Sequence, residues 1–194
     1  MLFDTLSAPA TAGALTGFER NAMEYIFDQT AGETAKQPLG RSNVGHGGCG
    51  AVATFNALVT MGKTPCLEQI IRRYRRRFGL RMFGWAGISL WSVADFFASS
   101  GYAVKLCADP RKFNRVVREN DAGIFWYLWL NGKNRKHPVG AHYVHAAFRD
   151  GRFHCYNLHR GQTGAVETDD LRKMMKQEAV CALLLGIREK VKDS

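Results

Sequence analysis

The chain has 194 residues, a length that favours a single domain. Its hydrophobic fraction of 46% and charged fraction of 23% are close to globular averages, which excludes disordered, collagen-like and coiled-coil proteins. Lysine and arginine total 27 against 17 aspartates and glutamates, and the net charge of +10 makes nucleic acid or an anionic surface the first partner to consider. No apolar run comes near the roughly 18 residues of a transmembrane helix.

The cysteines and the N-terminus indicate the compartment. The 5 cysteines are odd in number, spread along the chain and never in CxxC spacing, which excludes a disulfide framework and a zinc ribbon. Asp4 stands where a signal peptide would carry Lys or Arg, and no sustained apolar core follows it. We therefore expect a reduced, cytoplasmic protein in which residues 1–16 form a loosely ordered arm and residues 17–194 form one domain.

Helical patterns dominate the first half of the chain. Residues 31–48 are rich in Gly, Ser, Thr and Asn, which predicts a loop that ends in the string GHGG. Apolar residues recur at helical spacing directly after this string, so a helix is expected to begin at or beside Cys49. The helices predicted from such patterns and from capping residues span 18–27, 49–62, 64–77 and 90–100.

The pattern changes to strands in the second half. Residues 123–130 form a continuous aromatic and aliphatic run, which is typical of a strand buried on both faces. Asp150-Gly151 predicts a tight hairpin between strands at 141–148 and 152–158. The other predicted elements are strands at 102–107 and 180–187 and helices at 110–119 and 168–176. Because helices and strands segregate, the expected fold class is α+β with an antiparallel sheet.

Cys49 is the candidate nucleophile. It follows two glycines, which leave the approach to its sulfur open, and it stands at the start of a predicted helix. Unpaired N–H groups and the positive end of the helix dipole favour a thiolate there, so we expect a lowered pKa for this thiol. A thiolate in such a position can attack a carbonyl carbon.

The predicted hairpin sorts the histidines by face. Because side chains alternate along a strand, His142 and Asn157 share one face, and His145 lies on the other. The first face is the more apolar, so we expect it to meet the helical half. His142 and Asn157 are then diagonal neighbours, and the amide oxygen of Asn157 can hold the imidazole in one tautomer. His159, directly opposite His142, is the competing base.

Two strings resemble motifs of the papain-like cysteine peptidases, most closely the small bacterial branch that includes the leader-cleaving domains of bacteriocin-exporting transporters. NVGHGGCGAVATFNALVTMG resembles the cysteine-bearing helix, and GAHYVHAAFRDGRFHCYN resembles the histidine hairpin. The resemblance covers Asn43 to Asn157 in order. It implies a papain-like fold, in which a helical half with the cysteine packs on an antiparallel sheet with the histidine.

The resemblance also implies roles for individual residues. Cys49 matches the nucleophile, His142 the general base and Asn157 the residue that orients the base. The family usually has a Gln six residues before the cysteine as an oxyanion donor, whereas this chain has Asn43, which we expect to complete an oxyanion hole with the N–H of Cys49. The residues expected around the substrate cleft are His46, Gly47, Gly48, Trp85 and His159.

The residues around Cys49 also allow two other interpretations. His46 and Cys49, together with His142 or His159, could bind zinc, but only one ligand pair has the tight spacing of a structural site. The string GHGGCG lacks the following GK[ST] of a phosphate-binding loop. We therefore expect neither a metal nor a cofactor.

The sequence thus predicts a cysteine peptidase that cleaves peptide or amide bonds through an acyl-enzyme. One alternative is a non-catalytic peptide-binding module on the same fold, which the Asn43 departure favours. Another is an acyl or amide transferase that uses the same thioester chemistry, because only the acceptor differs.

The arginine-rich stretch at 70–81 (IIRRYRRRFGLR) accounts for part of the excess charge. It is interpreted either as a solvated helix face or as a docking surface for an acidic peptide, a leader or a membrane. The chain has no nucleic-acid recognition motif, which disfavours that partner. We expect a peptide or protein substrate of acidic or leader-like character.

Overall fold

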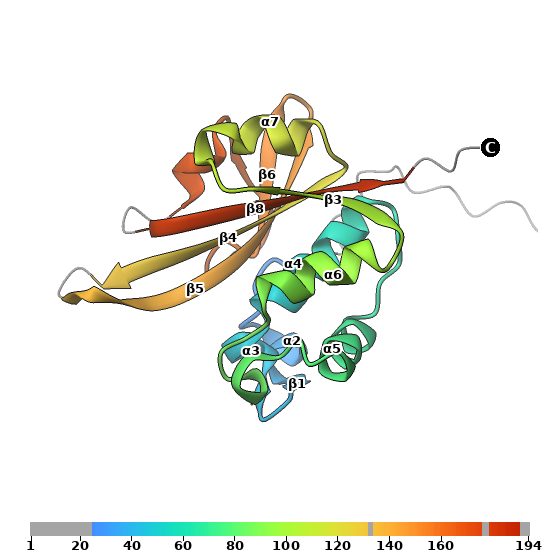
Figure 1. Cartoon of the computed structure of the whole chain (residues 1–194), viewed down its shortest axis with the longest axis vertical. Helices are drawn as coiled ribbons and strands as arrows, with labels where there is room; N and C mark the ends of the chain where they lie inside the picture. The colour runs from blue at the N-terminus through green and yellow to red at the C-terminus, as the bar shows by residue number, and fades with distance from the viewer. Residues whose placement is uncertain (1–24, 132–133, 176–178, 191–194) are drawn as a thin grey trace, which may run out of the picture.

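The computed structural model describes residues 25–131, 134–175 and 179–190, and these residues form a helical layer against an antiparallel sheet (Figure 1). The predicted arm at 1–16 and most of the predicted helix at 18–27 lie outside them. The helices are α2 (Gly32–Lys36), α3 (Val44–Gly47), α4 (Cys49–Thr60), α5 (Leu67–Arg76), α6 (Leu90–Ala98) and α7 (Phe113–Arg118), with 3₁₀ turns η1 (Arg81–Gly84), η2 (Pro110–Lys112) and η3 (Leu171–Met174).

The strands form two sheets. The main-sheet strands are β3 (Tyr102–Cys107), β4 (Ala122–Asn131), β5 (Asn134–Arg149), β6 (Arg152–Tyr156), β7 (Val166–Thr168) and β8 (Ala179–Glu189). Their spatial order is β3-β8-β4-β5-β6-β7, and every neighbouring pair is antiparallel. A separate small sheet pairs β1 (Pro38–Leu39) with β2 (Ser42–Asn43). No helix in the described part of the chain is long and apolar enough to cross a membrane.

The main sheet is covered on both faces, because successive side chains of its central strands point into different cores. Ile124 of β4 and Tyr143 of β5 pack into the core formed with α4, α5 and α6. Phe125 and Val144, one residue further along each strand, pack into the core formed with α7. Figure 1 shows α4 and α6 on one side of the sheet and α7 on the other.

Two glycines let α7 approach the sheet closely. Gly123 of β4 pairs directly with Gly186 of β8. A Cβ at Gly123 would lie 2.6 Å from a methyl of Val117, and one at Gly186 would lie 2.7 Å from a methyl of Val116. Real Cβ atoms essentially never come this close to a neighbour, so a larger residue at either position would force the valines of α7 to shift.

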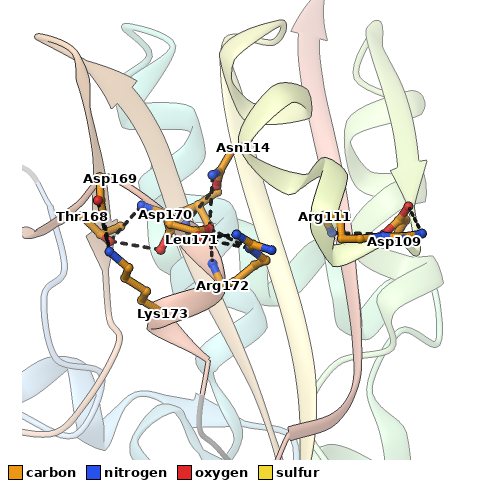
Figure 2. A network of polar contacts seen from close by, with 9 residues as sticks. All are labelled: Asp109, Arg111, Asn114, Thr168, Asp169, Asp170, Leu171, Arg172 and Lys173. Atoms are coloured by element: carbon orange, nitrogen blue, oxygen red, sulfur yellow. Dashed lines mark hydrogen bonds and ion pairs between the residues drawn. The ribbon is translucent and has the colours of Figure 1, made fainter.

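Polar contacts tie η3 to α7 (Figure 2). The Asn114 amide of α7 donates to the Asp170 carboxylate at 3.1 Å and accepts from the N–H of Leu171 at 3.0 Å. The carboxylate of Asp170 also accepts from the N–H of Arg172 at 3.0 Å, which caps η3. These bonds close the β7–η3 connection over the α7 side of the sheet.

The structure confirms several predicted elements. The fold class is α+β, the helix at Cys49–Thr60 begins at the predicted residue, and the strand at Tyr102–Cys107 has the predicted bounds. The Asp150-Gly151 hairpin is also confirmed, because Arg149 pairs with Arg152 across it.

The predicted face of the hairpin was wrong. The face that meets α4 carries Tyr143, His145 and Ala147, whereas Val144 and Phe153 pack against α7. Apolarity could not decide between the faces because both are buried. The expected pairing of His142 with His159 is also wrong, since the ladder ends at His145 and Tyr156.

Two predicted helices were wrong where the structure describes them. Residues 25–27, the end of the helix predicted at 18–27, are not helical. The helix predicted at 168–176 is replaced by the end of β7 and the turn η3. Thr168 pairs with Phe153 at the edge of the sheet, and its hydroxyl bonds to the backbone of Asp170, which competes with a helical start.

Candidate active site

Cys49 is the first residue of α4 and follows directly on α3. The Asn43 side chain caps α3 by accepting from the N–H of His46 at 2.9 Å. A Cβ at Gly48 would lie 2.5 Å from Val44, so glycine there lets α3 turn straight into α4. The sulfur is therefore presented at a helix N-terminus by a tight local turn.

Cys49 lines a cavity of about 450 Å³ between the helical half and the sheet. One wall is the loop after α5, which contributes Arg81, Trp85 and Ile88, and the other is formed by the β4 and β5 strands. His46 and Gly47, from the turn before Cys49, also line it. The rings of His46 and Trp85 meet edge to face at 5.4 Å between centroids.

Burial changes the expected ionisation of Cys49. The residue is only 9% exposed, and desolvation raises the pKa of its thiol. The N–H groups of Tyr143, Gly50 and Cys49 itself act in the opposite direction. The predicted lowering of this pKa was wrong, because desolvation of the sulfur outweighs the helix N-terminus. Cys49 is therefore a thiol at neutral pH.

His142 lies on β5 between Ala141 and Tyr143, which line the cavity of Cys49, whereas His142 itself is not among the lining residues. Its Nε2 is 2.6 Å from the main-chain oxygen of Asn157. A carbonyl oxygen can only accept, so Nε2 carries the proton, and Nδ1 is the unprotonated nitrogen of the neutral ring. The ring of Tyr127 meets the imidazole edge to face at 6.2 Å between centroids.

Asn157 contacts His142 through its main-chain oxygen and not through the side-chain oxygen that the sequence predicts. Its backbone is left-handed at φ 58°, a conformation that Asn tolerates better than most residues, and this turns its carbonyl toward His142. Its side chain instead pairs with Gln29: Oδ1 accepts from the Gln29 N–H, and Nδ2 donates to Gln29 Oε1, both at 2.9 Å.

Gln29 is a residue that the sequence analysis missed. Its Nε2 donates to the main-chain oxygens of Val44 at 3.2 Å and Gly45 at 3.4 Å, in the turn before Cys49. It therefore links the residue that holds His142 to the turn that presents Cys49. Because Gln29 and Asn157 are 128 positions apart, no local pattern could have revealed the contact.

His145 faces α4 but has a structural environment. Its Nδ1 donates to the Gly123 oxygen at 2.9 Å, and its Nε2 accepts from the Thr60 hydroxyl at 2.6 Å. Burial lowers the pKa of His145 to about 3, so the ring is neutral. Thr60 ends α4, 11 residues after Cys49, which corresponds to about 16 Å along the helix.

The remaining candidates lie apart from the cavity. Asn43 is exposed, and neither it nor Gly48 is among the residues that line the cavity of Cys49. His159 is exposed beyond the end of β6 and does not line that cavity either. Within residues 25–131, 134–175 and 179–190, no three His, Cys, Asp or Glu side chains gather as a metal site.

Comparisons with known proteins give little sequence similarity. No protein-family model matches the chain, and no curated protein matches its sequence. A matching solved structure is the peptidase domain of Streptococcus ComA, a bifunctional ABC transporter involved in a quorum-sensing pathway. It is 11% identical, the match covers 73% of this chain and 91% of that chain, and the TM-score is 0.45. The function proposed for this chain therefore rests on its own residues and geometry.

Proposed function

We propose that this chain is a cysteine-type hydrolase that cleaves peptide or amide bonds with Cys49 as nucleophile. One observation carries the proposal: Cys49 opens α4 at the wall of a cavity that Ala141 and Tyr143, the neighbours of His142 on β5, also line. The candidate nucleophile and the strand that carries the candidate base thus border the same cavity, which offers space for a substrate.

The proposed reaction begins with proton transfer, because burial keeps the Cys49 thiol protonated. His142 Nδ1 takes the proton from Sγ while Nε2–H remains bonded to the Asn157 oxygen. Sγ then attacks the substrate carbonyl carbon, and the tetrahedral intermediate collapses to a thioester as His142 returns the proton to the leaving amine. Water, deprotonated by His142, then attacks the thioester carbonyl carbon. The C–S bond breaks, the carboxylic acid leaves, and His142 returns the proton to Sγ.

The oxyanion of the tetrahedral intermediate needs hydrogen-bond donors. In this proposal the N–H of Cys49 is one donor. Asn43, the expected second donor, lies outside the residues that line the cavity, and its side-chain oxygen caps α3. Arg81 and Trp85 line the cavity, which favours peptide substrates with acidic and apolar side chains. An amine in place of water would make the same thioester a transferase intermediate.

A peptide-binding module without turnover is the second candidate. Two observations favour it: burial raises the pKa of Cys49, and Asn43 lies outside the set of residues that line the cavity. Such a module would bind a peptide in the cavity without cleaving it.

The experiment compares wild type with Cys49→Ala and His142→Ala on a library of fluorogenic peptides. Loss of the nucleophile should lower hydrolysis about 1000-fold or more. A peptidyl acyloxymethyl ketone should alkylate Cys49 in wild type and much more slowly in His142→Ala. Cys66→Ala is the matched control, because Cys66 is exposed and away from the cavity.

Hydrolysis that survives Cys49→Ala, or alkylation that falls on Cys66 instead, would overturn the proposal. Peptide binding without turnover in both wild type and Cys49→Ala would establish the binding module in its place.

A further inference from the structure

An unusual set of apolar side chains is exposed between α5 and α6. Phe78 is 95% exposed, Met82 73%, Phe83 and Trp91 69%, and Trp85 59%. Single exposed apolar residues are ordinary, but this many large ones within 14 consecutive positions (78–91) indicate an interaction surface. Together with the arginines of α5 they are called the 72–91 surface.

Three of these exposed residues have an unfavourable backbone conformation. Phe78, Met82 and Phe83 all have positive φ, which is unfavourable for bulky residues. The loop is nevertheless ordered, since Leu80 and Ile88 form a β-bridge and the Phe83 oxygen accepts from the N–H of Arg41 at 2.8 Å. The loop is thus ordered by hydrogen bonds in a strained conformation that exposes aromatic rings. A binding partner for these rings would explain why the strain is retained.

The same surface is strongly basic. Residues 67–91 contain 6 arginines and 1 glutamate. Arg72 pairs with Glu68 and Arg77 pairs with Asp95. Arg75 and Arg76 are exposed, and no carboxylate among the described residues pairs with either. The partner of the 72–91 surface should therefore be anionic.

The surface is continuous with the candidate active site. Arg77 and Trp91 line a cavity of about 240 Å³ between α5 and α6. Trp91 and Arg81 line the next cavity, of about 370 Å³. Arg81 also lines the cavity of Cys49. Figure 1 shows α5 on the side of the helical layer away from the sheet.

We propose that the 72–91 surface binds an anionic lipid membrane, with its aromatic side chains in the interfacial region and its arginines at the headgroups. Phe78, Met82 and Phe83 line none of the three cavities, so they protrude rather than form a groove for a peptide. An acyl-chain boundary accepts protruding rings without a matched shape, and anionic headgroups attract flanking arginines. A second copy of the chain would present the same positive charge and be repelled.

The experiment measures co-sedimentation of the full chain with vesicles of phosphatidylcholine alone and of phosphatidylcholine with 30% phosphatidylserine. Binding should require phosphatidylserine and weaken as salt is raised. Each arginine is expected to contribute about fivefold, so Arg75→Gln/Arg76→Gln should bind about 25-fold more weakly. Phe78→Ser/Phe83→Ser should lose about tenfold or more at unchanged charge.

The matched control is Arg111→Gln/Arg115→Gln, which removes the same charge from exposed side chains on the opposite side of the sheet. It should bind within about twofold of wild type. Alkylation of Cys49 by the peptidyl probe, or far-UV circular dichroism if the probe fails, verifies that the variants are folded.

Three outcomes would overturn the proposal. The first is no binding to the phosphatidylserine vesicles, and the second is equal loss in the control and the Arg75→Gln/Arg76→Gln variant. The third is that Arg75→Gln/Arg76→Gln binds vesicles as wild type does but no longer captures a synthetic acidic amphipathic peptide, or has a different oligomeric state. That result would assign the surface to a peptide or to a second copy.

Discussion

Cys49 at the start of α4 and His145 against its last residue, Thr60, are both buried, and burial acts on their pKa values in opposite directions. It raises the pKa of the thiol and lowers that of the imidazole, because in each case the charged form is the one disfavoured. Burial, aided by the charge of Arg149, keeps His145 neutral against the opposing effect of its bond to Gly123. Its two ring nitrogens are bonded to Gly123 and Thr60, which suits a structural role. Cys49, neutral as well, depends on His142 for activation in the proposed mechanism.

The neutral His145 predicts acid sensitivity. Its pKa is about 3 in the folded chain, against about 6.5 in an unfolded one. The unfolded state therefore binds an extra proton between these values, and stability falls as pH drops below 6.5. From pH 6.5 to 5 the loss from this group should approach about 2 kcal/mol.

Urea unfolding of wild type and His145→Gln at pH 7 and pH 5 measures this loss. The variant should start less stable but lose less between the two pH values. His159→Gln, which alters an exposed histidine, should keep the wild-type dependence. An equal pH dependence in wild type and His145→Gln would contradict the assignment.

At the scale of elements, residues 25–30, which form neither helix nor strand, hydrogen-bond to the turn that precedes Cys49. Residues 25–30 run along α4, where Asn56 exchanges two hydrogen bonds with the backbone of Ile26. Further on, Gln29 bonds both to Asn157 and to the α3 turn. We infer that Gln29 is a positioning residue. It holds Asn157, the hydrogen-bond partner of His142, at a fixed position relative to the turn that precedes Cys49.

Gln29→Ala is expected to lower kcat of the proposed peptide hydrolysis by about 10- to 100-fold with little change in KM, because small misplacements weaken catalysis strongly. Gln29→Glu keeps an acceptor for Asn157 but loses the donor to Val44, so it should be intermediate. Steady-state kinetics on the fluorogenic substrate measures both variants.

Asn56→Ala is the matched control, since it also removes two hydrogen bonds to the same segment without touching Asn157. It should lose a similar free energy of unfolding, about 1–3 kcal/mol, but little kcat. Equal losses of kcat in Asn56→Ala and Gln29→Ala would show that Gln29 acts only through stability.

At the scale of the whole molecule, the sheet is a shared wall between two cores. The α4 side carries the candidate active site, whereas the α7 side is closed by tight packing at Gly123 and Gly186 and by the Asn114 bonds. The chain has a net charge of +10. Its ion pairs join largely exposed side chains. Such pairs contribute little, so self-repulsion should dominate the response to salt.

Thermal unfolding should therefore depend on ionic strength. Raising NaCl from about 10 mM to 150 mM shortens the screening length from about 30 Å to 8 Å, and we expect Tm to rise by about 2–4 °C. Differential scanning fluorimetry measures the shift, and KCl should reproduce it. A fall in Tm would show that the surface ion pairs outweigh the repulsion.

Much of the fold could be predicted from local pattern. Alternation and apolar runs located the strand at Tyr102–Cys107 and the buried β4 strand, and helical spacing located the start of α4 at Cys49. Turn chemistry located the hairpin at Asp150-Gly151. These features are set by neighbouring residues, whose side-chain periodicity and backbone preferences act over a few positions.

The sequence by itself therefore determined the α+β class, the element that carries Cys49 and the hairpin that carries His142. Only the tertiary structure decided which hairpin face meets α4, which group of Asn157 holds His142, and in which direction the pKa of Cys49 moves. Each of these depends on burial or on a partner far away in the chain, as with Gln29 and Asn157 at a separation of 128 positions. Local periodicity contains no information about such partners, because packing between distant segments selects them.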